Sequence, residues 1–196
     1  GIVLHGSQQN QIGGTGPNEG NLIASNEGNG ITLEAFSDGN TIQGNAIGLG
    51  VQNVPLGNQG DGIRLDSSYQ NLIGGDSPAA GNVIRSNNGY GVNLVYGSSE
   101  DTIRLNSISA NTGGGIKLAE GANGGITPPE IFLTSPISGY SIAVGTVDVY
   151  ADMGAQGLLY VGNGATKDGA WYLHDDDAQF GGYNFTATVT DAAGNP

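Results

Sequence analysis

Two acidic residues and one basic residue stand at matching places in a short repeated phrase. Glu34 and Asp66 each directly follow a Gly-Ile-x-Leu phrase, and Arg64 fills the free third position of the second phrase. If the two phrases form neighbouring strands, the carboxyl groups lie about 5 Å apart with the guanidinium beside them. Carboxylates at that separation could bind a cation or serve as the acid and nucleophile of a retaining glycosidase.

The same three residues also fit a purely structural role. Opposite charges on adjacent strands often pair on a solvated surface, and such pairs are far commoner than functional carboxylate sites. We therefore expect Arg64 to neutralise Glu34 and Asp66, and we predict no catalytic residue. The three residues still form the candidate ligand-binding set of this sequence.

The last third of the chain adds two features with binding potential. Asp175, Asp176 and Asp177 could bind calcium, which prefers several oxygen ligands. Consecutive carboxylates point in different directions, so we expect a solvated loop, no metal site, and calcium as the only cofactor that the sequence allows. Trp171 and Tyr172 could stack on sugar rings, but a lone Trp in a predicted strand is more typical of a core.

The phrase that positions Glu34, Arg64 and Asp66 recurs along the chain as part of a longer repeat. Gly-Ile-x-Leu, with Val in place of Ile in one copy, begins at Gly1, Gly30, Gly62, Gly91 and Gly115. Two Asn-x-Ile phrases, with Asp in one copy, lie between successive copies. Three short strands per repeat cannot bury their apolar faces alone, but identical strands stacked along an axis can. The sequence therefore predicts an all-β fold that begins with a right-handed parallel β-helix of about four coils.

Side-chain alternation within these strands assigns the core and the surface. The Ile and Leu positions face inward and the free position faces solvent. The predicted core contains Ile42, Ile63, Ile73, Ile84, Leu94 and Ile103, and the predicted surface positions are Thr32, Arg64, Asn93 and Lys117.

Asparagine recurs in register at the corners between the predicted strands. The columns are Asn10, Asn40, Asn71 and Asp101; Asn21, Asn45, Asn82 and Asn106; and Asn26, Asn58, Asn87 and Asn111. Asn and Gly tolerate the left-handed backbone that sharp turns require, and stacked amides can bond to one another along a column. We expect these asparagines to form structural ladders.

Composition excludes several classes of function. The 196 residues include 18 acidic and 5 basic residues, and the net charge of −13 makes nucleic-acid binding improbable. The absence of cysteine excludes disulfides and thiolate metal sites. No apolar run approaches the length of a membrane span, so we expect no membrane insertion in this segment. The chain begins within a repeat and is expected to be a piece of something longer.

The repeat fades after Leu118, and we divide the chain there. We predict a β-helix over residues 1–125, a linker over 126–130 containing Pro128 and Pro129, and a β-sandwich over 131–196. The strands of the sandwich are expected at residues 131–134, 146–151, 158–161, 170–173 and 184–190.

Both parts resemble known families. The Gly-Ile-x-Leu, Asn-x-Ile and Ile-Gly-Gly phrases of the first 125 residues resemble the β-helix repeats of pectate lyases and periplasmic carbohydrate-binding proteins. The remainder is similar to immunoglobulin-like modules that follow such helices in bacterial surface proteins, on residues 145–152, 169–171 and 186–195. In those modules one more strand follows, so we expect the last strand to be missing or donated by a neighbour.

From these features we expect a non-catalytic, extracellular or cell-surface structural or adhesive protein. It would associate with itself or with other surface proteins, as a filament or layer subunit joined through open strand edges. The alternative is a carbohydrate-binding or polysaccharide-cleaving module that uses the outer face of the Gly-Ile-x-Leu ladder, with Glu34, Arg64 and Asp66. Fold resemblance alone does not decide between them.

Overall fold

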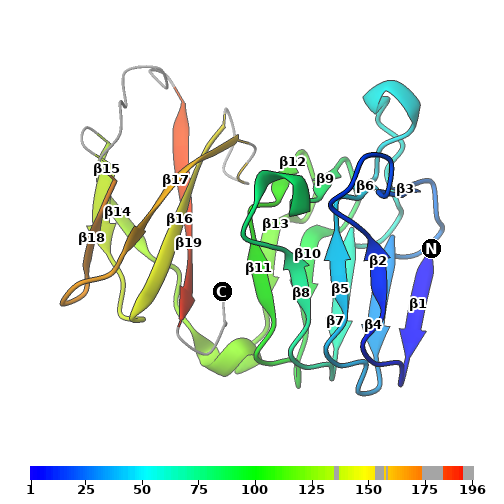
Figure 1. Ribbon diagram of the computed structural model, residues 1–196, viewed down its shortest axis with the longest axis horizontal. Helices are drawn as coiled ribbons and strands as arrows, with labels where there is room; N and C mark the ends of the chain where they lie inside the picture. Colours follow the sequence, from blue (N-terminus) through cyan, green and yellow to red (C-terminus); the bar gives the residue numbers. More distant parts are fainter. Residues whose placement is uncertain (135–136, 153–156, 158, 174–182, 192–196) are drawn as a thin grey trace.

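The computed structural model describes residues 1–134, 137–152, 157, 159–173 and 183–191. Within these ranges the chain forms strands and three short 3₁₀ turns, and no α-helix. Two parts lie side by side: a stack of parallel strands, and a smaller antiparallel part that begins near residue 130 (Figure 1). None of the described segments is a helix long and apolar enough to cross a membrane.

The first part contains three parallel sheets stacked like those of a β-helix. We name them sheets A, B and C. Sheet A consists of β1 (Ile2–His5), β4 (Ile31–Glu34), β7 (Ile63–Asp66), β10 (Tyr90–Leu94) and β13 (Gly114–Leu118). Sheet B consists of β2 (Gln11–Gly13), β5 (Thr41–Gln43), β8 (Leu72–Gly74) and β11 (Thr102–Arg104). Sheet C consists of β3 (Leu22–Ile23), β6 (Ala46–Ile47), β9 (Val83–Arg85) and β12 (Ser107–Ser109).

One strand from each sheet makes a coil, so the chain completes four coils before β13. Turns η1 (Val51–Asn53), η2 (Pro78–Ala80) and η3 (Ala122–Gly125) lie outside the sheets. The long loop that carries η1 projects from the stack (Figure 1).

Strand register confirms the predicted core. Ile31 pairs with Ile63, and Ile63 pairs with Val92, so identical positions stack from coil to coil. All six predicted core residues are at most 2% exposed. The surface prediction is wrong for Asn93, which is 6% exposed. Its amide is buried because Nδ2 donates a hydrogen bond of 2.8 Å to Oδ2 of Asp61 on the same face.

The three predicted asparagine columns are present as hydrogen-bonded ladders. In each step the backbone N and the side-chain Nδ2 of one residue both donate to Oδ1 of the next. Asn82 shows the full pattern: it accepts from Asn45, and its Nδ2 donates to Asn106 Oδ1 and to Ile42 O, each at 2.8 Å. The column that ends in Asp101 has one further member that was not predicted: Asn123, whose Oδ1 accepts a hydrogen bond from Asp101 N.

The second part consists of two antiparallel sheets around one apolar cluster. One sheet has the order β14 (Glu130–Thr134), β15 (Ile137–Tyr140), β18 (Ala170–Tyr172), and the other β17 (Leu159–Ala165), β16 (Gly145–Asp152), β19 (Asn184–Asp191). Trp171 is 1% exposed and packs in this cluster with residues of both sheets, which confirms its core assignment, whereas Tyr172 is 57% exposed. Residue 158 of the predicted strand 158–161 lies outside the described residues.

Strand β15 was not predicted, and Gly139 is the reason. A glycine inside a strand weakens the alternation by which strands are recognised. Here the backbone needs it, because a Cβ on Gly139 would lie 1.7 Å from Glu130 O and 2.6 Å from the Trp171 ring.

The second part covers the last coil of the stack. At such an end the amides that would pair with another coil need other acceptors. Leu105 N donates to the hydroxyl of Tyr150 at 3.2 Å, and Ile108 N donates to Gly157 O at 3.0 Å. The two parts are therefore joined by hydrogen bonds in addition to the connecting chain.

Candidate functional site

Sheet A brings two of the three candidate residues together as expected. Glu34 and Asp66 are direct partners in the β4–β7 register, and Arg64 lies opposite Thr32. Because Ile63 and Leu65 point into the core, Arg64 and Asp66 lie on the outer face of the sheet.

The charges on this face pair differently from the prediction. Arg64 approaches Asp61 at 3.7 Å and Asp66 at 3.6 Å, and its partners do not include Glu34 among the ion pairs of the described residues. Glu34 instead contacts His5 Nδ1 at 3.0 Å, in the coil before it. The expected trio is thus divided: Arg64 lies between Asp61 and Asp66, and Glu34 pairs with His5.

Asp61 is the member of this site that sequence reasoning missed. Its Oδ1 accepts from Tyr90 N at 2.8 Å, and its Oδ2 accepts from Asn93 Nδ2 at 2.8 Å. Its own N donates to Asn29 Oδ1 at 2.8 Å. The sequence held a sign that Asp61 belongs to this face, because it stands directly before a repeat glycine. Asn29 and Tyr90 stand at the same position of their own coils.

The outer face continues along β10 and β13. Lys117 Nζ lies 4.9 Å from the centre of the Tyr90 ring, a cation–π arrangement. Asn93 Oδ1 is buried and has no hydrogen-bond partner in the part of the chain that the structure describes. The outer face of sheet A is therefore a polar surface on which acidic and basic groups nearly balance. Most of these groups already have protein partners.

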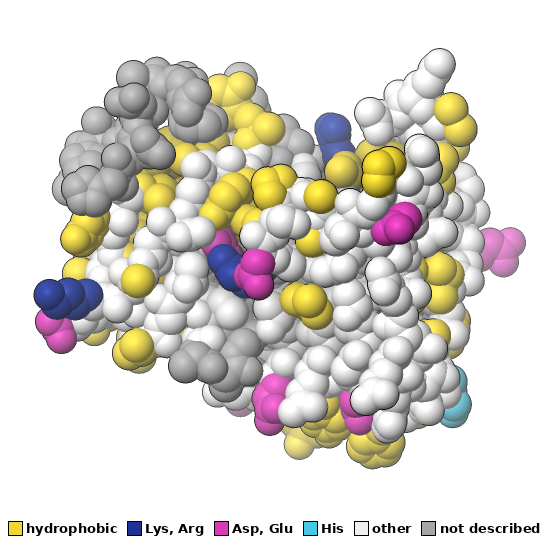
Figure 2. Space-filling model, viewed as in Figure 1, with side chains coloured by type: hydrophobic (Ala, Val, Ile, Leu, Met, Phe, Trp, Pro, Cys, Tyr) yellow, Lys and Arg dark blue, Asp and Glu magenta, His cyan; other side chains and the backbone are white. Residues whose placement is uncertain are grey.

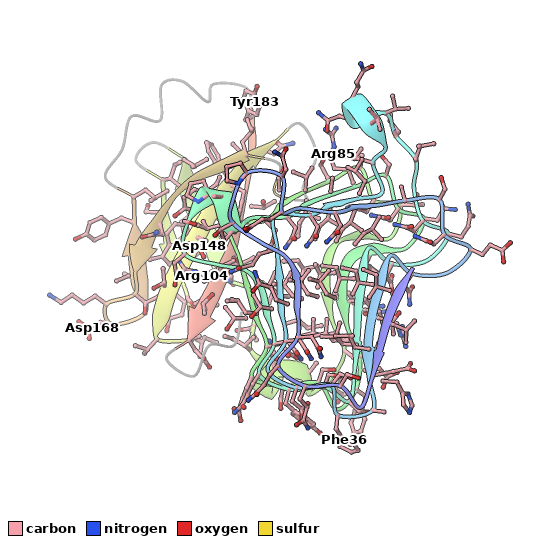
Figure 3. All side chains as sticks on the ribbon, turned by 45° about the vertical axis from the view of Figure 1, so that its right-hand side comes forward. Phe36, Arg85, Arg104, Asp148, Asp168 and Tyr183 are labelled. Atoms are coloured by element: carbon pink, nitrogen blue, oxygen red, sulfur yellow. The ribbon has the colours of Figure 1, made fainter. Side chains whose placement is uncertain are left out.

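A second charged cluster lies at the junction of the two parts. Arg104 donates from Nε and Nη2 to the fully buried Asp148 at 2.8 and 3.0 Å, and it also pairs with Asp76. The hydrogen bonds to Asp148 raise the pKa of the Arg104 guanidinium above its ordinary value. Figure 3 labels Arg104 beside Asp148, and Figure 2 shows acidic and basic side chains next to one another between the two parts.

A cavity of about 440 Å³ lies beside this cluster, between the last coil and the second part. Its wall includes Ile108, Ile116 and Leu118 from the stack and Tyr150 and Val189 from the antiparallel sheet. Burial raises the pKa of the Tyr150 phenol above its ordinary value. Among the described residues, none that lines the cavity is charged, so the cavity could hold an apolar molecule.

The calcium hypothesis is not tested by the geometry. Asp175, Asp176 and Asp177 lie outside the described residues. Within the described ranges, no three His, Asp or Glu side chains are grouped so that they could hold a metal ion.

Comparisons with known proteins identify no relative of this chain. No family model matches it, and neither does any curated protein or solved structure.

Proposed function

We propose that this chain is a non-catalytic, extracellular structural or adhesive protein. In this proposal the first part is a right-handed parallel β-helix, and the second is an immunoglobulin-like module. The stacked sheets, the asparagine ladders and the two-sheet core support these assignments. The proposed β-helix spans residues 1–125, the linker spans 126–130, and the immunoglobulin-like module spans 131–196.

The observation that carries the non-catalytic proposal is the pairing of charges on sheet A. A catalytic carboxyl must face substrate with a group available to give or take a proton. Here Asp61 is held by Tyr90 and Asn93, and Asp66 and Glu34 each contact a basic side chain. These contacts give each acid a structural role on the strand ladder.

One observation favours the alternative function. Glu34 and Asp66 are direct partners in register on neighbouring strands. Strands in a sheet are about 4.8 Å apart, which is close to the separation of the two carboxyl groups in a retaining glycosidase. Polysaccharide binding or cleavage on this face therefore deserves a direct test.

The test is an incubation of the purified protein with neutral and acidic polysaccharides, with assays for bound protein and for new reducing or unsaturated ends. The proposal predicts no chain cleavage. Cleavage that disappears in Asp66→Asn or Glu34→Gln would replace it with the enzymatic alternative. Sedimentation of the same material over a range of concentrations measures the proposed self-association.

A further inference from the structure

The turns that follow β4, β7 and β10 lie at one corner of the stack, and each carries an aromatic residue. These residues are Phe36, Tyr69 and Tyr96, and we call them the aromatic corner. The turns are in register: Phe36 N donates to Ser67 O at 2.8 Å, and Tyr69 bridges to Ser99 in the next coil. Successive coils are about 4.8 Å apart, so the rings spread along the stack axis over about two coil spacings.

Two of the three rings in the aromatic corner face solvent, and Tyr69 is partly buried. Phe36 is 60% exposed and Tyr96 is 81% exposed. Phe36 points away from the body of the molecule (Figure 3). The rings of Phe36 and Tyr69 stack, with centroids 6.2 Å apart and planes 12° from parallel, which joins them into one apolar surface. None of the three residues belongs to a core cluster.

Folding does not account for Phe36. Its φ of 65° follows a φ of 54° at Ala35, and left-handed backbone is unfavourable for a bulky side chain. In strand register Ala35 corresponds to Gly6 and Ser67, which also have positive φ, and Phe36 is a second left-handed residue in its turn. A strained residue that buries little surface costs stability, and such residues persist where they serve binding.

Polar groups border the rings. Gln70 Nε2 donates to Glu100 Oε2 at 2.8 Å, and Asp38 Oδ1 accepts from Tyr69 N at 2.9 Å. Amides and carboxylates are good partners for hydroxyl groups. Figure 2 shows acidic and hydrophobic side chains next to one another along the lower edge of the molecule. Together with the net charge of −13, these carboxylates repel an anionic ligand.

We propose that the aromatic corner binds an uncharged polysaccharide. A pyranose ring has an apolar C–H face that can stack on an aromatic ring, and hydroxyl groups at its edge that can bond to carboxylates and amides. A polymer of such rings can contact several coils at once, so that weak contacts add along the stack. The charge of the border selects a neutral chain over uronates, sulfated glycans and nucleic acids.

This inference rests on the adhesive form of the proposed function and assigns its surface and ligand class. It does not involve Glu34, Arg64 or Asp66.

The experiment is affinity electrophoresis of the whole chain in gels that contain a soluble neutral β-glucan, xyloglucan or galactomannan, or polygalacturonate or heparin as anionic probes. We expect at least one neutral polymer to retard the protein and the anionic polymers not to. Phe36→Asn and Tyr96→Ala should each weaken binding roughly tenfold or more, because the ring supplies the contact. Phe36→Asn should melt at or above the wild-type temperature, because Asn tolerates positive φ. Its loss of binding would therefore not be a folding defect.

Tyr172→Ala is the matched control, since Tyr172 is also exposed, at 57%, but lies in the second part. It should bind like the wild type. The inference is overturned if no neutral polymer retards the protein, if Phe36→Asn binds equally well, or if only anionic polymers bind. It is also overturned if the corner variants abolish self-association and nothing else. Cleavage of a polymer would instead remove the non-catalytic function and leave the corner to be judged by its own variants.

Discussion

Asp101 is an acid in a column that is otherwise built of asparagine. Its Oδ1 accepts from both N and Nδ2 of Asn71, at 3.0 and 2.9 Å, as an asparagine would. Its N donates to Asn123 Oδ1. An asparagine here would also donate from its side-chain Nδ2 to that oxygen, but Asp101 has Oδ2 in place of the Nδ2 group. This Oδ2 is buried without a hydrogen-bond partner among the described residues. Burial raises the pKa of Asp101 to about 7.

Asp101 should make stability fall as the pH rises. Its folded pKa is raised above the ordinary 3.8. Its favourable contribution is therefore complete below about pH 4 and is lost as the pH rises to about 7, a change of at most about 4 kcal/mol. Asp101→Asn should remove this pH dependence and stabilise the protein at pH 8. Urea melts of both proteins at pH 5 and pH 8 measure it, and an unchanged pH dependence in the variant would contradict the assignment.

Asn82 should contribute more to stability than a surface charge does. Removing its amide leaves buried partners on Asn45, Asn106 and Ile42 unpaired, so Asn82→Ala should cost about 1 to 3 kcal/mol. Glu100→Ala, at an exposed turn, should cost under about 0.5 kcal/mol. The free energies of unfolding from denaturant melts decide this, and equal costs would refute the ladder argument.

At the scale of the elements, the spacing of the coils depends on glycine at close approaches. Gly74 in β8 has a φ of 86°, and a Cβ there would lie 1.9 Å from Arg104 O in β11. Gly74→Ala should therefore destabilise the stack by roughly 2 to 4 kcal/mol. Gly28→Ala is the control, because a Cβ at Gly28 meets nothing within 4 Å. Comparable melting temperatures for the two variants would show that the coils are not packed this closely.

The stacked sheets could be predicted because their information is local and repeated. Alternate residues of a strand face the core, so the repeat pattern predicts that each of its Ile side chains is buried. Contacts that depend on non-repeating neighbours were not predictable in the same way. Asn93 was predicted to face solvent because its partner Asp61 lies outside the strands and gives no strand pattern. Strand β15 was missed because it contains Gly139, where the close approach of the Glu130 backbone leaves no room for a side chain. Arg104 and Asp148 carry no sequence signal of their pairing across 44 residues.

At the scale of the whole molecule, Arg104 should hold the two parts together. Arg104→Ala would leave the buried carboxylate of Asp148 uncompensated, which typically costs about 3 to 5 kcal/mol. Asp76→Ala should cost little, because the Asp76 side chain is 87% exposed. Denaturant melts of the two variants test this. A neutral Arg104→Ala, or a cost as large for Asp76→Ala, would mean that the junction does not depend on the buried pair.

We propose that the charged face of sheet A stabilises the structure and that the aromatic corner binds the polysaccharide. The most direct measurement compares the retardation of Phe36→Asn and Asp66→Asn by the same neutral polysaccharide gel, with both variants shown to be folded. We expect Phe36→Asn to migrate as if no polysaccharide were present and Asp66→Asn to be retarded like the wild type. Loss of retardation in Asp66→Asn with normal retardation of Phe36→Asn would contradict this proposal.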